Sequence, residues 1–339
     1  MNTLYDFSTD DLEPGADGPA VRPQSMMFTL YGDYIIHRGG EVWVGTLIQI
    51  AAEFGLSEQA VRSSLSRMSR NGWLRVRRIG NRGYYSLTPK SKRLLEEGAE
   101  RIFVRRTGAW DGRWRVLTYS IPERRREVRD ELRKQLTWMG FGPLSNGTWI
   151  SPHQLEREVA ALAERLAIRD LVEMFAATHL GFADDRTLAQ RCWDLAALNA
   201  RYAAFVAQWQ PRYEAHRQRL ARGEQIPDSQ CFVERFLLLH EYRRFFFLDP
   251  ELPAELLPAG WLGGAAAQLF QAYHALLAER ANAYLDSVFE APPSARRRAA
   301  PTPVAAPAAA ELLAAGYDQL AGVSGQVSAL SRQSTAVDR

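Results

Sequence analysis

The sequence predicts an α+β fold that is divided into several domains. The chain has 339 residues, more than one domain usually contains. Helical and strand spacings of apolar residues alternate over residues 23–93 and again over 114–178, whereas residues 185–289 show helical spacing. These patterns predict domains at 23–106, 107–184 and 185–290, a disordered acidic arm at 1–22, and a Pro/Ala-rich linker and tail at 291–339.

The first domain is expected to begin with two helices separated by a short strand. Apolar residues recur with helical spacing over residues 23–37, which predicts the first helix. Alternation over residues 41–44 predicts a strand. Residues 45–54 predict a second helix, which ends at Gly55.

A third helix follows Ser57, which is a favourable N-cap residue. Val61, Leu65 and Met68 recur at helical spacing and define its apolar face. Strands are then expected at 73–79 and 84–87, joined by the turn residues 80–83. A helix of this kind followed by a hairpin is typical of a winged helix-turn-helix domain.

Positive charge is concentrated on this helix and hairpin. Residues 57–93 contain ten Lys or Arg residues and one acidic residue, a net charge of +9, whereas the whole chain carries only +3. A basic module of this kind is expected where a protein binds nucleic-acid phosphates. The alternative interpretation is a solvated basic face on an ordinary helix.

The predicted roles of these side chains follow from the geometry of DNA. An α-helix fits the major groove, and residues near its N-terminus reach the base edges. The candidates for base contacts are Gln59, Arg62, Ser63 and Ser66. The candidates for phosphate contacts are Arg67, Arg70, Arg77, Arg78 and Arg82, of which Arg82 could instead enter the minor groove.

Long motifs then occur in order between residues 25 and 289. They are LYGD (30–33), HRGGEVW (37–43), NGWL (71–74), RIG (78–80), YSL (85–87), WDGRW (110–114), DPELP (249–253) and LLPAGW (256–261). Together these motifs resemble the PaaX family of transcriptional repressors. The resemblance implies repression of phenylacetate catabolic operons through double-stranded operator DNA, with phenylacetyl-CoA as the effector that releases the operator.

The middle domain is expected to be ferredoxin-like. Strands are predicted at 114–119, 148–151 and 170–178, and helices after Pro122 and over 155–166, which gives the order β-α-β-(β)-α-β. In the family this domain resembles a small CRISPR-associated nuclease. The first strand ends without a carboxylate, however, and Asp111 stands alone before it. We therefore expect no catalytic residues, no metal site and no enzymatic activity.

The C-terminal domain is expected to be helical. A heptad seam runs through Leu188, Cys192, Leu195, Asn199, Tyr202, Val206 and Trp209. It indicates either a coiled coil or, as we favour, a core helix packed within one chain. Pro211 should end or kink this helix. Further helices are expected at 231–248 and 265–289, with His240 as a hydrogen-bonded core residue.

An acyl-CoA effector would need positive charge for its phosphates and an aromatic slot for its acyl group. The candidates are Trp110, Arg113, Trp114, Trp149, Arg243 and Arg244. For the tryptophans, packing in the domain core is the alternative. For the two arginines of the C-terminal domain, the alternative is an ion pair with Glu234, Glu241 or Asp249.

The composition also limits the location of the protein and the class of protein to which it can belong. The only two cysteines, Cys192 and Cys231, are expected to be reduced thiols of a cytoplasmic protein, and no apolar run is long enough to span a membrane. A helix-turn-helix protein usually reads paired half-sites, so we expect a homodimer without a cofactor. The alternatives are an enzyme acting on nucleic acid or an acyl-CoA, and a nonspecific architectural DNA binder.

Overall fold

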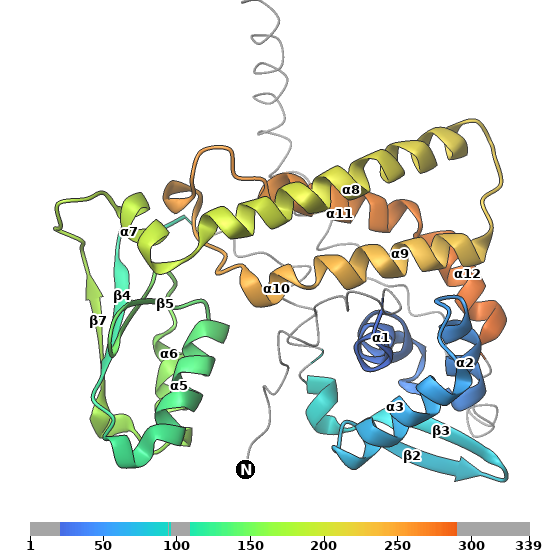
Figure 1. Ribbon diagram of the computed structural model, residues 1–339, viewed down its shortest axis with the longest axis horizontal. Coiled ribbons are helices and arrows are strands. Elements are labelled where there is room, and N and C mark those ends of the chain that lie inside the picture. Colours follow the sequence, from blue (N-terminus) through green and yellow to red (C-terminus); the bar gives the residue numbers. More distant parts are fainter. Residues whose placement is uncertain (1–20, 94, 96–108, 290–339) are drawn as a thin grey trace, which may run out of the picture. The chain divides into compact units, whose positions relative to one another are not determined.

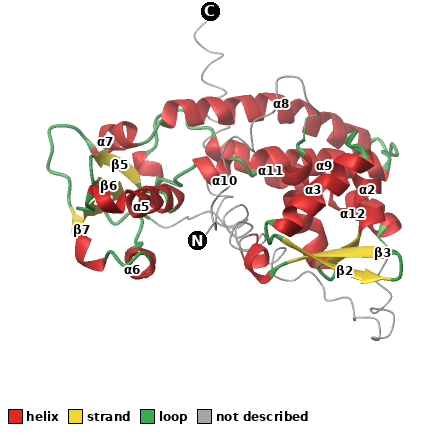
Figure 2. Ribbon diagram, turned by 60° about the horizontal axis from the view of Figure 1, so that its bottom comes forward, coloured by secondary structure: helices red, strands yellow, loops and turns green. Residues whose placement is uncertain are grey.

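The computed structural model describes residues 21–93, 95 and 109–289 of the 339-residue chain (Figure 1). The fold is α+β, and Figure 2 shows the drawn strands gathered in two small sheets while the C-terminal region is helical. Over these residues, no helix is both long and apolar enough to cross a membrane. The predicted acidic arm, linker and tail lie outside the described residues, apart from positions 21 and 22.

The N-terminal region contains the predicted order of elements. It comprises α1 (Pro23–Leu30), a π-helical turn (Tyr31–Ile35), a 3-10 turn (Ile36–Arg38), β1 (Glu41–Trp43), α2 (Val44–Ala52), α3 (Glu58–Arg70), β2 (Leu74–Ile79) and β3 (Arg82–Leu87). β3 lies between β1 and β2 and is antiparallel to both. The second hairpin strand begins two residues earlier than predicted, because only Gly80 and Asn81 form the turn.

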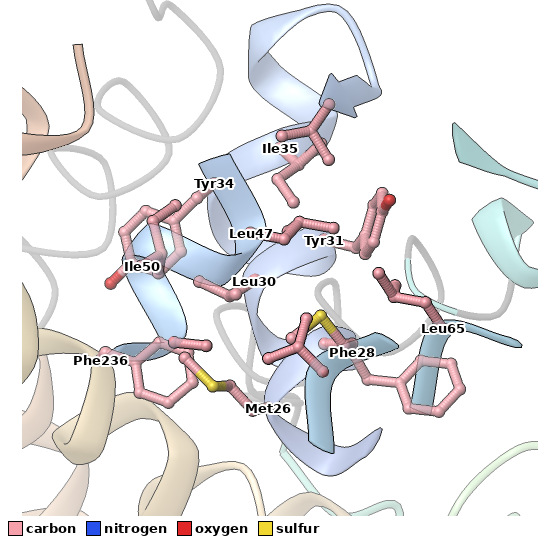
Figure 3. Close-up of a cluster of buried hydrophobic side chains, with 14 of the residues drawn as sticks. Met26, Phe28, Leu30, Tyr31, Tyr34, Ile35, Leu47, Ile50, Leu65 and Phe236 are labelled. Carbon is pink, nitrogen blue, oxygen red and sulfur yellow. The ribbon is translucent and has the colours of Figure 1, made fainter. Parts of the chain in front are cut away.

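The apolar faces of α1, α2 and α3 converge on one core (Figure 3). Val61, Leu65 and Met68 of α3 are fully buried there, as their spacing predicts. Residues from the far end of the chain belong to the same core, among them Phe232 and Phe236. The N-terminal elements therefore share their hydrophobic core with C-terminal helices.

The middle region is built on a four-stranded sheet. Its elements are β4 (Trp114–Tyr119), α5 (Arg126–Trp138), β5 (Gly142–Ser145), β6 (Thr148–Ser151), α6 (Glu156–Arg165) and β7 (Val172–Ala177). The strand order is β5-β6-β4-β7, and every neighbouring pair is antiparallel. Residues of α5 and α6 share one core with Leu117 and Trp149 of the sheet, while Trp114 and Ile150 belong to a second core with α7 (Asp185–Cys192).

The C-terminal helices are α8 (Leu195–Ala221), α9 (Asp228–Tyr242), α10 (Phe245–Leu248), α11 (Gly263–Leu276) and α12 (Ala278–Val288). Residues of α8, α9 and α11 form a core within the chain, and this core includes Tyr202 and Trp209 of the heptad seam. This part of the seam therefore packs within one chain, as we favoured. Asn199 of that seam donates a hydrogen bond to the Gly260 carbonyl and accepts one from the Leu262 amide. It therefore fixes the loop before α11.

Two expectations for this region are wrong, and one of the two outcomes expected at Pro211 is excluded. The seam is not one helix, because α7 ends at Cys192 and the Asp194 carboxylate caps a new helix by accepting from the Ala197 amide. Pro211 does not end α8, because both Pro211 and the Ala207 carbonyl that loses its partner are on the exposed face. The helices predicted at 231–248 and 265–289 are each divided in two.

Candidate nucleic-acid interface

The helix α3 is held at its start by the predicted cap. The Ser57 hydroxyl accepts a hydrogen bond from the Ala60 amide at 3.2 Å, which satisfies one of the free N–H groups of the first turn. Arg62 Nε donates to Glu58 Oε1 at 2.7 Å, one helical turn earlier. This pair is exposed, so it orients the guanidinium more than it stabilises the fold.

The structure brings all nine DNA-binding candidates to the surface. Every one of them is exposed, while the opposite side of α3 is buried in the core. They are Gln59, Arg62, Ser63, Ser66, Arg67 and Arg70 on α3, and Arg77, Arg78 and Arg82 on the hairpin. A buried apolar face thus presents a basic, hydrogen-bonding face to solvent.

Two hairpin arginines are positioned by the short strand β1. Both guanidinium edge nitrogens of Arg77, Nε and Nη2, donate to the carboxylate of Glu41. Arg82 lies over the ring of Trp43, with its Cζ atom 4.6 Å from the ring centroid. Arg67, Arg70 and Arg78 have no acidic partner in the part of the chain that the structure describes.

Sequence reasoning missed Glu41 and Trp43 as positioning residues. The alternation over residues 41–44 predicts a strand, but it does not give the register that pairs Trp43 with Tyr84. Sequence reasoning also missed Arg75, a further exposed arginine on β2. The run of basic residues was the signal that could have added Arg75 to the candidates.

The six effector candidates do not form one cluster. Trp110 and Trp114 make an edge-to-face contact with centroids 5.3 Å apart, and exposed Arg113 lies between them in sequence. Trp149 instead lies in the core beneath α5 and α6, on the other face of the sheet from Trp114. Arg243 and Arg244 follow α9, and Arg243 donates a hydrogen bond to Ser25 of α1.

The tryptophans have structural partners. The Trp114 indole donates to Asp185 Oδ1 at 2.7 Å, and its ring also stacks on Trp193. Trp149 is 5% exposed. Core packing, the alternative interpretation, therefore describes both Trp114 and Trp149.

Asp111, the carboxylate just before the first strand of the middle sheet, belongs to an ion-pair network. Asp111 lies 2.7 Å from Arg115, a buried arginine that also pairs with Glu156. Although desolvation acts to raise the pKa of Asp111, its hydrogen bonds with Arg115 and the Arg113 amide hold that pKa below its usual range. Among the described residues, no group of three or more His, Cys, Asp or Glu side chains could hold a metal ion.

A buried polar cluster connects α1 and its π-helical turn to the C-terminal helices. Arg235 of α9 donates to Asp33 at 3.2 Å and to the His274 carbonyl at 3.1 Å. Burial acts to raise the pKa of Asp33, but the Arg235 charge and His274 outweigh it and hold the pKa well below its usual range. Burial and the Arg235 charge lower the pKa of His274, so its imidazole is neutral near pH 7.

His240 is a hydrogen-bonded core residue, as predicted. Its Nδ1 atom lies 2.9 Å from the Thr29 hydroxyl, and its ring stacks on Phe236. Burial, followed by the charges of Arg243 and Arg244, lowers the pKa of His240 well below its usual value. Cys192 and Cys231 are free and buried, as expected.

Comparison with known proteins covers most of the described chain. Residues 22–91 match the family model of the PaaX-like protein, 107–189 match the PaaX protein central Cas2-like domain, and 193–287 match the PaaX-like protein C-terminal domain. Transcriptional repressor PaaX of Escherichia coli (strain K12) is 36% identical over 252 residues, which cover 74% of this chain and 78% of that protein. Uncharacterized protein Rv0674 from Mycobacterium tuberculosis, a solved structure, covers 79% of this chain and 98% of its own with 25% identity and a TM-score of 0.48. The family-model matches and the identity to the repressor show that this chain belongs to the PaaX family.

Proposed function

We infer that this protein is a DNA-binding transcriptional repressor of phenylacetate catabolic genes and is a regulator rather than an enzyme. The observation that carries this conclusion is the exposed basic face of α3 and the β2–β3 hairpin, which lies within the segment that matches the PaaX-like protein model. The related Escherichia coli protein is named a transcriptional repressor. Exposed arginines next to hydroxyl and amide side chains suit binding to phosphates and base edges.

We further assign the N-terminal elements to a winged helix-turn-helix. The succession of α2, a turn, α3 and a basic hairpin supports this assignment, with β1 as the third strand of the wing. For the middle region, two helices on one face of an antiparallel sheet ordered β5-β6-β4-β7 support a ferredoxin-like domain. We propose domain boundaries at 23–106, 107–184 and 185–290.

In this proposal α3 enters the major groove with its N-terminal half. The side chains that then face base edges are Gln59, Arg62, Ser63 and Ser66, and Arg62 is paired with Glu58. The phosphate contacts come from Arg67, Arg70, Arg77, Arg78 and Arg82. Stacking on Trp43 gives Arg82 a defined position on the wing, where it reaches a phosphate or the minor groove.

The repressor is proposed to act as a homodimer on paired half-sites. An aryl-acyl-CoA, phenylacetyl-CoA by family resemblance, would favour a conformation in which the two copies of α3 no longer match the half-site spacing. Of the effector candidates, Trp110 and Arg113 are accessible near the start of β4, and Arg243 and Arg244 supply positive charge near α1. The buried Trp114 and Trp149 would support the sheet.

The deciding experiment is fluorescence anisotropy of the full chain on its own upstream DNA and on a scrambled duplex. Specific binding that phenylacetyl-CoA releases, while free phenylacetate and acetyl-CoA do not, is the expected result. If none of the three compounds changed the specific binding, the DNA-binding proposal would stand and the proposed effector would be rejected. Equal, salt-sensitive affinity for both duplexes would favour a nonspecific architectural protein.

A further inference from the structure

A buried arginine lies beside the first turn of α1. Arg243 is 8% exposed, and its Nη2 atom donates to the Ser25 hydroxyl at 2.5 Å. Its Nε atom is buried without an acceptor among the residues that the structure describes, and no carboxylate of those residues pairs with its guanidinium. Burial and the Arg244 charge lower the pKa of Arg243 to about 10, so it stays protonated at neutral pH.

The surroundings of this guanidinium are also positive. Ser25 is the third residue of α1, and the N-terminus of that helix has neither a side-chain cap nor an acidic residue in its first turn. A helix N-terminus carries partial positive charge, and Arg244 adds a full charge next in sequence. A buried cation in such surroundings destabilises the fold unless an anion neutralises it.

The donors define the shape of that anion. Nε and Nη2 lie on one edge of the planar guanidinium, which matches two oxygens of an oxyanion. The Ser25 hydroxyl accepts from Nη2 and retains its own proton for donation. We propose that Arg243, Ser25 and the first turn of α1 form an oxyanion-binding site, and that its ligand is a phosphate group.

Phosphate suits these donors because its several oxygens can engage a guanidinium, a hydroxyl and helix N–H groups together. The bound anion would bridge the end of α9 and the start of α1, and would thereby stabilise the packing of the DNA-binding elements on α9. The phosphate could be the free ion or part of a larger molecule. Inorganic phosphate and AMP are therefore the two probes.

The test is thermal unfolding of the full chain at constant ionic strength with increasing inorganic phosphate. The Tm of the wild type should rise and saturate, because a ligand that binds only the folded state stabilises it. Arg243→Met should raise the half-saturating phosphate concentration about tenfold or more. In phosphate-free buffer this variant should unfold at the same temperature as the wild type or higher, since it removes an unpaired buried charge.

Arg201→Met, which removes an exposed arginine of α8, is the matched control and should respond to phosphate like the wild type. Ser25→Ala keeps the arginine and should weaken the response even if Arg243→Met does not fold. A lower half-saturating concentration for AMP would assign the phosphate to an organic molecule, and equal values would assign the free ion. An unchanged response in both Arg243→Met and Ser25→Ala would overturn the proposal without affecting operator binding, which this experiment does not measure.

Discussion

At the residue scale, the candidate DNA contacts differ in what holds each arginine before DNA arrives. Glu58 holds Arg62, Glu41 holds Arg77, and Trp43 supports Arg82. An arginine that is already oriented loses less side-chain freedom when it binds either a base edge or a phosphate. Of these three, Arg62 is the proposed base contact, whereas Arg77 and Arg82 are proposed phosphate contacts.

The first prediction separates these roles. Arg62→Ala should cost about 1–3 kcal/mol of binding free energy on the operator and much less on scrambled DNA, because it removes a base contact. Arg82→Ala should weaken binding to both duplexes and reduce by about 1 the slope of the logarithm of the binding constant against the logarithm of the salt concentration. Anisotropy titrations at several salt concentrations measure both effects. Arg169→Ala in the middle region is the control, and equal losses on the two duplexes for Arg62→Ala would reject its base contact.

A second residue-scale prediction concerns the buried Asp33–Arg235 pair. Asp33→Asn leaves the Arg235 guanidinium buried without its carboxylate and should lower the free energy of unfolding by about 3–5 kcal/mol. Asp286→Asn removes an exposed carboxylate that pairs with the partly buried Arg38 and should lower the free energy of unfolding by about 1 kcal/mol at most. Denaturant unfolding at pH 7 measures both losses.

The same pair predicts a pH dependence. The pKa of Asp33 is lower in the folded chain than in the unfolded chain, so its contribution to stability is fully present above the unfolded pKa of about 4 and is lost as the pH falls towards the folded pKa. The wild type should therefore lose more stability below pH 4 than Asp33→Asn does. If the free energy of unfolding fell with pH in the same way in both proteins, this assignment would be contradicted.

At the element scale, α8 shows how tertiary packing overrides a local signal. Leu198, Tyr202, Phe205 and Trp209 bury one side of the helix, and His216 extends that side beyond Pro211. The packing on both sides of the proline keeps the helix continuous, while the lost hydrogen bond falls on the exposed side. In an isolated peptide the same proline would favour a break.

This explanation predicts that Pro211→Ala stabilises the protein. Restoring the backbone hydrogen bond should raise the free energy of unfolding by about 1–3 kcal/mol, partly offset by the greater freedom of the unfolded chain. Urea denaturation with an unchanged m-value is the measurement. Ala203→Gly on the exposed face of the same helix should lower stability by about 1 kcal/mol and is the reference for a purely local effect. A destabilised Pro211→Ala variant would mean that the fold requires the proline ring.

At the scale of the whole molecule, the N-terminal elements share one hydrophobic core with α9 and α12. Phe236 of α9 contacts the rings of Tyr34 and Phe54, and Tyr284 of α12 donates a hydrogen bond to Glu53. Thr46 of α2 donates to the Val288 carbonyl, and Arg38 pairs with Asp286. The N-terminal elements and these two C-terminal helices should consequently unfold together.

Phe236→Ala tests this coupling at a residue of α9, outside the N-terminal elements. Loss of the Phe236 ring should lower the free energy of unfolding by about 3–5 kcal/mol. It should also accelerate hydrogen exchange in α3 as well as in α9. Phe175→Ala, at a side chain that is 53% exposed on β7, should change stability by no more than about 0.5 kcal/mol. Unchanged exchange in α3 of Phe236→Ala would show that residues 23–106 fold independently.

Features that depend on near neighbours in the chain can be predicted from the residue pattern. Local capping, periodicity and turn chemistry predict four such features. They are the Ser57 cap, the buried face of α3, the two-stranded hairpin and the order of helices and strands in the middle region. The pairing of surfaces that lie far apart in the chain could not be predicted and is seen in the folded protein. Asp33 pairs with Arg235 and Ser25 with Arg243 across some 200 residues, and Trp114 and Trp149 lie on opposite faces of one sheet. The physical reason is that such contacts depend on how whole apolar faces pack, which the spacing within one segment does not specify.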